Sequence, residues 1–389
     1  MEEIKKILAV MKEAVAHPGQ AVKNYKQMTG KGAVGCFPIY CPEEIVHAAG
    51  MLPVGMWGGQ TQISQALTIV PSFCCSIMQS NIELALKGVY KDLDAVIISS
   101  PCDTLKSIPQ DWGYAIPDIK VIQIVYPQMR KIESGVEYLK TEFLRVKQAI
   151  EGITGEPITD AALKKSIEVY NRHRRSLREF CTVARNYPLT ITPVVRHLVI
   201  KSGYFMEKSQ HTLLVDELSS ELKKLPPREW QGKPVFVKDF QQGKRVVLTG
   251  ITAEPDALLK IFDENRLTVV ADDLAQESRQ FRTDVPDGDE EPLLRLARQW
   301  SLIEGCSLAY DPQKKRVEML IELVKTAGAD GLIFCMMKFC DPEEFDYPII
   351  AEQFEAAGIP LLYLEIDQQQ QSLERERTRI QSFAEMLNR

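Results

Sequence analysis

Short apolar segments alternate with helix-like segments in two separate parts of this chain, and this alternation limits its fold more than any other feature. The first series has strand-like runs at 34–39, 52–56, 95–98 and 121–126, and helix-like segments at 42–49, 76–86 and 104–112. A second series begins at 245–250 and continues to a helix-like segment at 374–387. Because parallel strands need helical crossovers, this pattern predicts an α/β protein with two doubly wound, Rossmann-like parallel sheets.

Between the two series the pattern changes to long charged segments with helical spacing, at 135–150, 160–186 and 212–225. Pro226-Pro227 and Gly232-Lys233-Pro234 then mark a boundary. We therefore expect an N-terminal α/β domain (1–128), a helical region (129–235) and a C-terminal α/β domain (236–389). A first helix should end near His17, and the polar runs 284–291 and 368–371 should be solvated loops.

Charge and composition exclude several classes of function. The chain has 389 residues and a net charge of -6, which argues against a broad nucleic-acid surface. The charged start at Met1 lacks the apolar core of a signal peptide, and no apolar run approaches the roughly 20 residues of a membrane helix, so we expect a cytoplasmic protein. Neither a GxGxxG fingerprint nor a GxxxxGK[ST] phosphate loop is present, so the chain should not hydrolyse ATP itself.

Cysteines stand at the ends of two predicted strands. The segment Ser99–Asp103, which contains Cys102, directly follows the run 95–98, and Cys340 comes shortly after 331–336. A third cysteine, Cys75, opens the helix-like segment 76–86. Ligands of open α/β sheets bind outside the carboxyl ends of the strands, so these thiols could converge on one bound group. Soft thiolates beside a helix N-terminus suit an iron-sulfur cluster, which would make this a redox protein.

Other interpretations of the cysteines stay open at this point. The three thiols could be small buried core residues, a zinc site would need a fourth ligand, and a catalytic thiol would need a base that none of the five histidines obviously supplies. Cys74 and Cys75 cannot be separated as ligands. Cys36 and Cys41 could approach the same place, whereas Cys181 and Cys335 are better explained as buried apolar residues.

Two charged features are candidates for other roles. Glu44, in the first turn after Pro42, could act as an acid or base facing the crevice, although such a residue often only complements the helix dipole. The run 172–175 could contact an anionic partner or the phosphates of a cofactor, although such a run is usually a solvated helix face.

The chain resembles the 2-hydroxyacyl-CoA dehydratase family, which includes benzoyl-CoA reductase subunits. The resemblance rests on Tyr40–Gly50, Cys75-Ser76, Pro101–Thr104, Lys338–Pro342 and Gly358–Glu365, and it is most specific at the Cys-Asp and Phe-Cys-Asp-Pro segments. It implies three ligands, Cys75, Cys102 and Cys340, for a [4Fe-4S] cluster with a non-protein fourth ligand. The doubled Cys74-Cys75 departs from the usual single cysteine and leaves the first ligand in doubt.

The resemblance also implies a reaction and partners. In the family, an ATP-hydrolysing iron-sulfur activator supplies one electron, the thioester of the acyl-CoA substrate becomes a ketyl radical anion that expels hydroxide, and the electron returns after enoyl-CoA forms. This chain looks most like the smaller, β-type subunit, which pairs with a related larger α-type subunit and relays the electron; Glu44 then need not be a catalytic base. Some members are associated with a flavin, but no motif here places one.

Three alternatives remain from the sequence. A benzoyl-CoA-reductase-type subunit would leave the electron in the product, and a noncatalytic cluster carrier would need its cysteines only for stability. A homodimer with a larger double cluster would use the additional thiols of Cys36, Cys41, Cys74 and Cys306.

Overall fold

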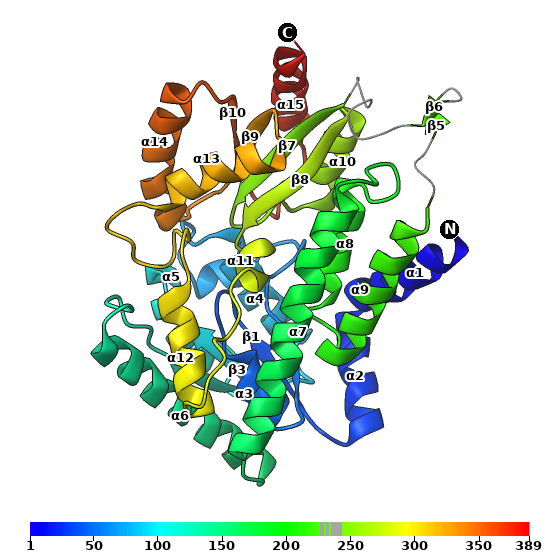
Figure 1. The fold of residues 1–389 in the computed structure, drawn as a ribbon. Coiled ribbons are helices and arrows are strands. Elements are labelled where there is room, and N and C mark those ends of the chain that lie inside the picture. Colours follow the sequence, from blue (N-terminus) through cyan, green and yellow to red (C-terminus); the bar gives the residue numbers. More distant parts are fainter. Residues whose placement is uncertain (226–228, 231–232, 235–242, 389) are drawn as a thin grey trace.

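The computed structural model describes residues 1–225, 229–230, 233–234 and 243–388, and two parallel four-stranded sheets form its centre (Figure 1). The first sheet has the order β2-β1-β3-β4 and consists of β1 (Ala33–Cys36), β2 (Leu52–Gly55), β3 (Ala95–Ser99) and β4 (Lys120–Ile124). The second has the order β10-β9-β7-β8 and consists of β7 (Lys244–Gly250), β8 (Leu267–Leu274), β9 (Gly331–Met337) and β10 (Leu361–Ile366). Both sheets therefore share one topology, 2-1-3-4 along the chain, and the predicted fold class is confirmed.

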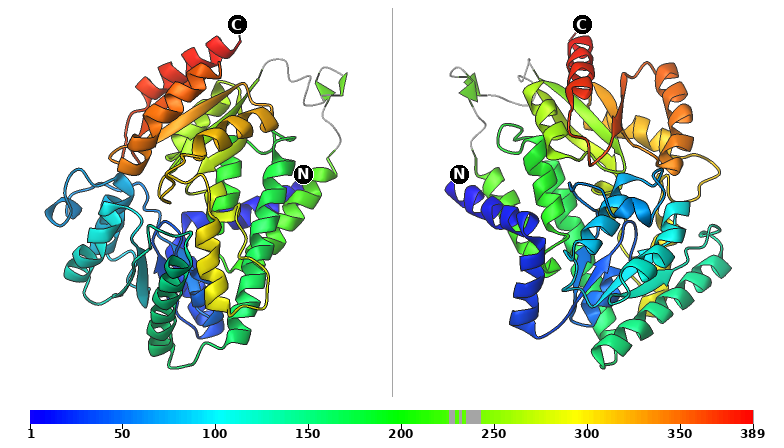
Figure 2. Two further views of the ribbon diagram at one scale, coloured as in Figure 1. Left: turned by 60° about the vertical axis from the view of Figure 1, so that its left-hand side comes forward. Right: turned by 180° about the vertical axis from the view of Figure 1, so that it is seen from behind.

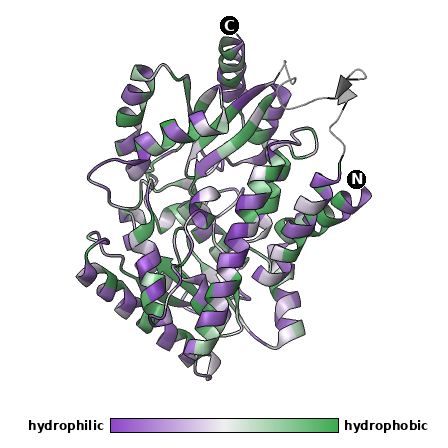
Figure 3. Ribbon diagram, viewed as in Figure 1, coloured by the Kyte–Doolittle hydropathy of each residue, from purple (hydrophilic) through white to green (hydrophobic). Residues whose placement is uncertain are grey.

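Helices cover both faces of the first sheet. One face carries α4 (Ser76–Leu86) and α5 (Asp103–Ala115), and the other carries α3 (Glu43–Ala48) and α6 (Glu133–Thr154). Successive side chains of a strand point to opposite faces, so Val96 and Ile98 pack towards α4 and α5, and Ala95 and Ile97 towards α3 and α6. Figure 3 shows the result as apolar strands beneath helices with mixed apolar and polar surfaces.

The second sheet is covered in the same way. Its helices are α10 (Asp256–Glu264), α11 (Ser278–Phe281), α13 (Arg316–Ala327), α14 (Asp341–Ala356) and α15 (Glu374–Leu387). Val246 and Leu248 pack with α10 and α15, whereas Val247 packs with α13 and α14 on the opposite face. One further helix of this part of the chain, α12 (Pro292–Leu302), packs instead against α6 of the first half.

A helical layer runs beside both sheets (Figure 2). It consists of α1 (Glu2–Ala16), α2 (Pro18–Thr29), α7 (Asp160–Ala184), α8 (Pro193–Ser202) and α9 (Lys208–Lys223). The long α7 contacts α3 of the first half and α11 of the second, so it holds the two halves together. Two of these helices are missing from the sequence prediction: α2 and α8 each begin at a proline, which suits the first position of a helix because its missing N–H would be unbonded there.

The connection between the helical layer and the second sheet includes a two-residue antiparallel pair, β5 (Glu229–Trp230) with β6 (Lys233–Pro234). The predicted domain boundary after 235 lies outside the described residues. A short 3-10 helix, η1 (Ala66–Thr68), lies in the segment before α4. In the part of the chain that the structure describes, no helix has the length and apolar character needed to cross a membrane.

Candidate metal centre

Cys75, Cys102 and Cys340 each occupy the position directly before a helix. They are the N-cap residues of α4, α5 and α14. Cys102 follows β3 and Cys340 follows β9, the third strands of their sheets, so these two thiols hold matching positions in the two halves. The first N–H groups of a helix lack partners within it and, together with the helix dipole, favour a negatively charged group at this position.

Backbone N–H groups act on all three sulfur atoms and lower the pKa of each thiol. The donors are Ile77 and Met78 for Cys75, Thr104 and Leu105 for Cys102, and Glu343 for Cys340. Burial has the larger and opposite effect: it raises the pKa of Cys75 to about 12, that of Cys102 to about 11, and that of Cys340 well above its usual range. The metal-free thiols are therefore protonated near neutral pH, in a backbone environment that favours thiolates once a metal displaces the protons.

The fold brings the three thiols together from both halves of the molecule. A charge on Cys75 or Cys102 raises the pKa of Cys340, and a charge on Cys102 raises that of Cys75. All three side chains pack against the same apolar cluster, which includes Ile77 and Met337. Two thiols from the N-terminal half and one from the C-terminal half are therefore close neighbours.

The neighbouring Cys74 faces a different part of the structure. Its thiol is buried, and its pKa is raised by burial and by the charge of Asp111, and lowered by a hydrogen bond with Thr104. The charge of Cys75, by contrast, is among the main influences on the pKa of Cys340. The geometry therefore favours Cys75 over Cys74 as a partner of Cys102 and Cys340.

The donor set fits an iron-sulfur group. Three thiols from separate elements, each beside backbone N–H donors, match the soft ligands and sulfur-directed hydrogen bonds of such clusters. Within the described ranges, no group of three or more His, Cys, Asp and Glu side chains is arranged to hold a metal ion. A [4Fe-4S] group differs from a single ion in this respect, because each thiolate binds a different iron and the three sulfur atoms need not meet at one point.

The remaining cysteines have other neighbours. Cys36 and Cys41 interact with each other at the end of β1, and the Cys41 thiol donates to the carbonyl of Phe37 at 3.1 Å. Cys306 lies 3.7 Å from a guanidinium nitrogen of Arg279. Cys335 is fully buried inside β9, as predicted.

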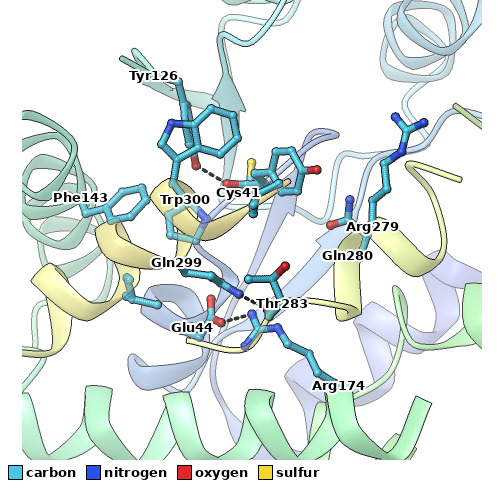
Figure 4. Close-up of a pocket in the computed structure, with 14 residues that line it drawn as sticks. Cys41, Glu44, Tyr126, Phe143, Arg174, Arg279, Gln280, Thr283, Gln299 and Trp300 are labelled. Atoms are coloured by element: carbon cyan, nitrogen blue, oxygen red, sulfur yellow. Dashed lines mark hydrogen bonds and ion pairs between the residues drawn. The ribbon is translucent and has the colours of Figure 1, made fainter. Parts of the chain in front are cut away.

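Glu44 is buried in a polar cluster of its own (Figure 4). Its carboxylate forms an ion pair with Arg174 on α7, and its backbone carbonyl accepts a hydrogen bond from Ser166 at 2.8 Å. Arg174 belongs to the run 172–175, in which His173 and Arg174 are buried and Arg172 is exposed, so the run is only partly a solvated face.

Two small cavities adjoin the Glu44–Arg174 pair. One of about 50 Å³ is lined by aromatic side chains that include Tyr126 and Trp300 (Figure 4), and the other of about 70 Å³ is lined by Tyr170 and the buried Lys208. Each has room for about one or two water molecules, far less than a CoA ester needs. The contacts of Glu44 fasten α3 to α7, and its action as an acid or base stays a prediction.

Gln368 corrects the prediction of a solvated loop at 368–371. Its side chain is buried, and its amide nitrogen donates to the Trp57 carbonyl at 2.9 Å and to Glu254 at 2.6 Å. The adjacent Gln369 donates to the carbonyl of Gly59 at 2.9 Å. Glutamines at the end of the second sheet therefore bind the loop that precedes Cys75, and sequence reasoning missed them because their polarity alone indicated solvent.

The fold and the site define an α/β protein with two matching sheets and three neighbouring cysteines at helix N-termini. The chain belongs to the 2-hydroxyglutaryl-CoA dehydratase D-component family, whose model matches residues 38–387. This finding agrees with the resemblance at the cysteine segments.

Named relatives match the whole chain. It is 48% identical over 388 residues to the lactoyl-CoA dehydratase subunit beta of Anaerotignum propionicum, with 100% of both chains covered. It is 44% identical to the (R)-phenyllactyl-CoA dehydratase beta subunit of Clostridium sporogenes, with 97% of both chains covered. It is 36% identical to the (R)-2-hydroxyglutaryl-CoA dehydratase subunit beta of Acidaminococcus fermentans, covering 99% of this chain and 100% of that one.

Proposed function

We propose that this chain is the β-type, iron-sulfur subunit of an (R)-2-hydroxyacyl-CoA dehydratase, a hydro-lyase that forms an enoyl-CoA. The observation that carries the proposal is the convergence of Cys75, Cys102 and Cys340, each at a helix N-terminus. The three relatives described above support it, because all are named as β subunits of dehydratases that act on 2-hydroxyacyl-CoA esters.

The three cysteines would hold a [4Fe-4S] cluster, which when bound supplies one-electron transfer. The chain itself would supply the ligands and the surroundings of the sulfur atoms. The three cysteines are partly buried, and the N–H groups of α4, α5 and α14 would stabilise the thiolates. The aromatic cavity beside Glu44 is too small for an acyl-CoA, so the substrate would bind elsewhere than in this cavity.

The proposed partners are that larger α-type subunit and an ATP-hydrolysing iron-sulfur activator. The chain lacks a phosphate-binding loop of its own, so the ATP-dependent step needs a second protein. The activator would donate one electron, and the subunit described here would pass it to its partner.

Reconstitution tests this function. The chain, its related subunit and the activator are combined under anaerobic conditions with (R)-lactoyl-CoA, (R)-phenyllactyl-CoA or (R)-2-hydroxyglutaryl-CoA. We expect many molecules of enoyl-CoA from one of these substrates for each electron supplied. Consumption of electrons in proportion to product would instead assign a reductase of the benzoyl-CoA type.

A further inference from the structure

A buried ion network lies beneath the first turn of α14, the helix that Cys340 caps. Glu343 is 0% exposed, and its carboxylate contacts Arg279 at 3.0 Å and Arg316 at 2.8 Å. The hydroxyl of Ser307 donates to the same carboxylate at 2.7 Å. Arg279, which also borders the cavity of Figure 4, and Arg316 both pair in addition with Asp273 on β8.

Glu343 acts on the Cys340 sulfur in two ways. Its backbone N–H donates to the carbonyl of Cys340 at 3.0 Å and lowers the pKa of the thiol beside it, whereas its negative charge raises that pKa and is the largest influence after burial. Water does not screen this charge, because both arginines and the carboxylate are buried. The charge of Glu343 therefore changes the electrostatic potential at the Cys340 sulfur.

Stability alone does not explain these charges. Removing ions from water is costly, and apolar side chains of similar volume often stabilise a core equally well or better. Two guanidinium groups and a hydroxyl donate hydrogen bonds to the carboxylate. The arrangement thus holds the Glu343 carboxylate in one place, one helical turn after a predicted cluster ligand, within a network of carboxylates and guanidinium groups.

We propose that Glu343 is a positioning residue that lowers the reduction potential of the iron-sulfur group held by Cys340. This inference rests on the proposed function. A negative charge nearby disfavours the addition of an electron, and net charge and hydrogen bonds to sulfur are established controls of cluster potential. The redox change is one electron gained from the activator and one electron passed to the partner subunit, with no bond made or broken. A lower potential makes the donated electron more strongly reducing.

The test is a potentiometric titration, followed by EPR, of the anaerobically purified complex with its related subunit. Glu343→Gln removes the charge and keeps the shape, and Glu344→Gln is the matched control, because Glu344 is the next residue of the same helix and is exposed. We expect a positive shift of the midpoint potential in Glu343→Gln and a smaller shift in Glu344→Gln. Glu343→Asp, which retains the charge, should return the potential towards the wild-type value.

Further variants keep the test decisive. If Glu343→Gln does not retain iron, Asp346→Asn replaces it, because Asp346 is buried and shares Arg316 with Glu343 at 3.2 Å; its potential should also exceed that of Glu344→Gln. Equal potentials in the buried-charge variant and in Glu344→Gln overturn this inference and leave the proposed function intact. Wild-type protein without iron overturns both.

Discussion

Ser76 Oγ accepts a hydrogen bond from the backbone N–H of Gln368 at 3.1 Å, joining the residue after Cys75 to the segment that follows the last strand of the second sheet. The same hydroxyl lies 3.3 Å from the sulfur of Met337 at the end of β9. The N-terminus of α4 is therefore held directly against the half of the molecule that carries Cys340.

Replacing Gln368 by alanine should weaken this junction. The substitution removes one hydrogen bond to the Trp57 carbonyl and one to the buried Glu254, so we expect a loss of about 2 to 4 kcal/mol in the free energy of unfolding. Urea denaturation of the metal-free protein measures it. Gln371→Ala, at an exposed position of the same loop, is the control and should change stability by less than about 0.5 kcal/mol. Equal effects of the two substitutions would contradict the role of Gln368.

Replacing Cys74 and Cys75 separately shows which of the two adjacent cysteines is the cluster ligand. Cys75 caps α4 and acts electrostatically on Cys340, whereas Cys74 faces Thr104 and Asp111. We expect Cys75→Ser to lose most of its iron and Cys74→Ser to retain it, as measured by iron per chain after anaerobic purification. The reverse pattern would assign the ligand to Cys74.

The Glu44–Arg174 ion pair should contribute to stability as a coupled unit. Either substitution, Glu44→Gln or Arg174→Met, leaves one buried group without its partner, and each should lower the free energy of unfolding by about 3 kcal/mol. The double variant should lose less than the sum of the two, with a coupling of at least about 1 kcal/mol. Additive losses would show that the two side chains do not interact in solution.

Stability should fall at alkaline pH through His197. Burial lowers the pKa of this histidine, but its hydrogen bonds to Glu254 and Glu277 outweigh burial and raise the pKa to about 9. A histidine whose folded pKa lies above its unfolded value of about 6.5 stabilises the fold fully below pH 6.5 and loses that contribution as the pH rises through 9. Each pH unit in this window should cost up to about 1.4 kcal/mol.

Urea denaturation between pH 6 and pH 10 checks the effect of His197. The variant His197→Gln cannot take up the proton, so its stability should vary less with pH across the same window. Parallel pH profiles for the wild type and this variant would rule out the assignment.

Part of the structure could be predicted from sequence because strand ends are local features. Cys102 and Cys340 each follow an apolar run, so their place at the carboxyl edge of a sheet depends on residues next to them in the chain. The two α/β series are equally local, since their strands and helices have distinct apolar periods. The helix α2 was missed because Pro18 was interpreted as part of a helix end, although proline also suits a helix start.

Contacts between distant residues could not be predicted in this way. Gln368 is buried because Glu254, 114 positions away, and Trp57 accept its hydrogen bonds. Glu343 has two acidic neighbours in its helix turn, and only the fold identifies it as the one facing Arg279 and Arg316. From sequence alone, a polar residue is expected to be exposed to solvent, and only the fold reveals a buried partner.

The most direct test of the central claim is the amount of iron and acid-labile sulfide per chain, with EPR, in anaerobically purified wild-type protein and in Cys75→Ser, Cys102→Ser and Cys340→Ser. We expect about four iron and four sulfide in the wild type, and loss of the cluster signal in each variant. Zinc in place of iron, or wild-type protein without metal, would contradict the three-cysteine cluster and leave these thiols as structural residues.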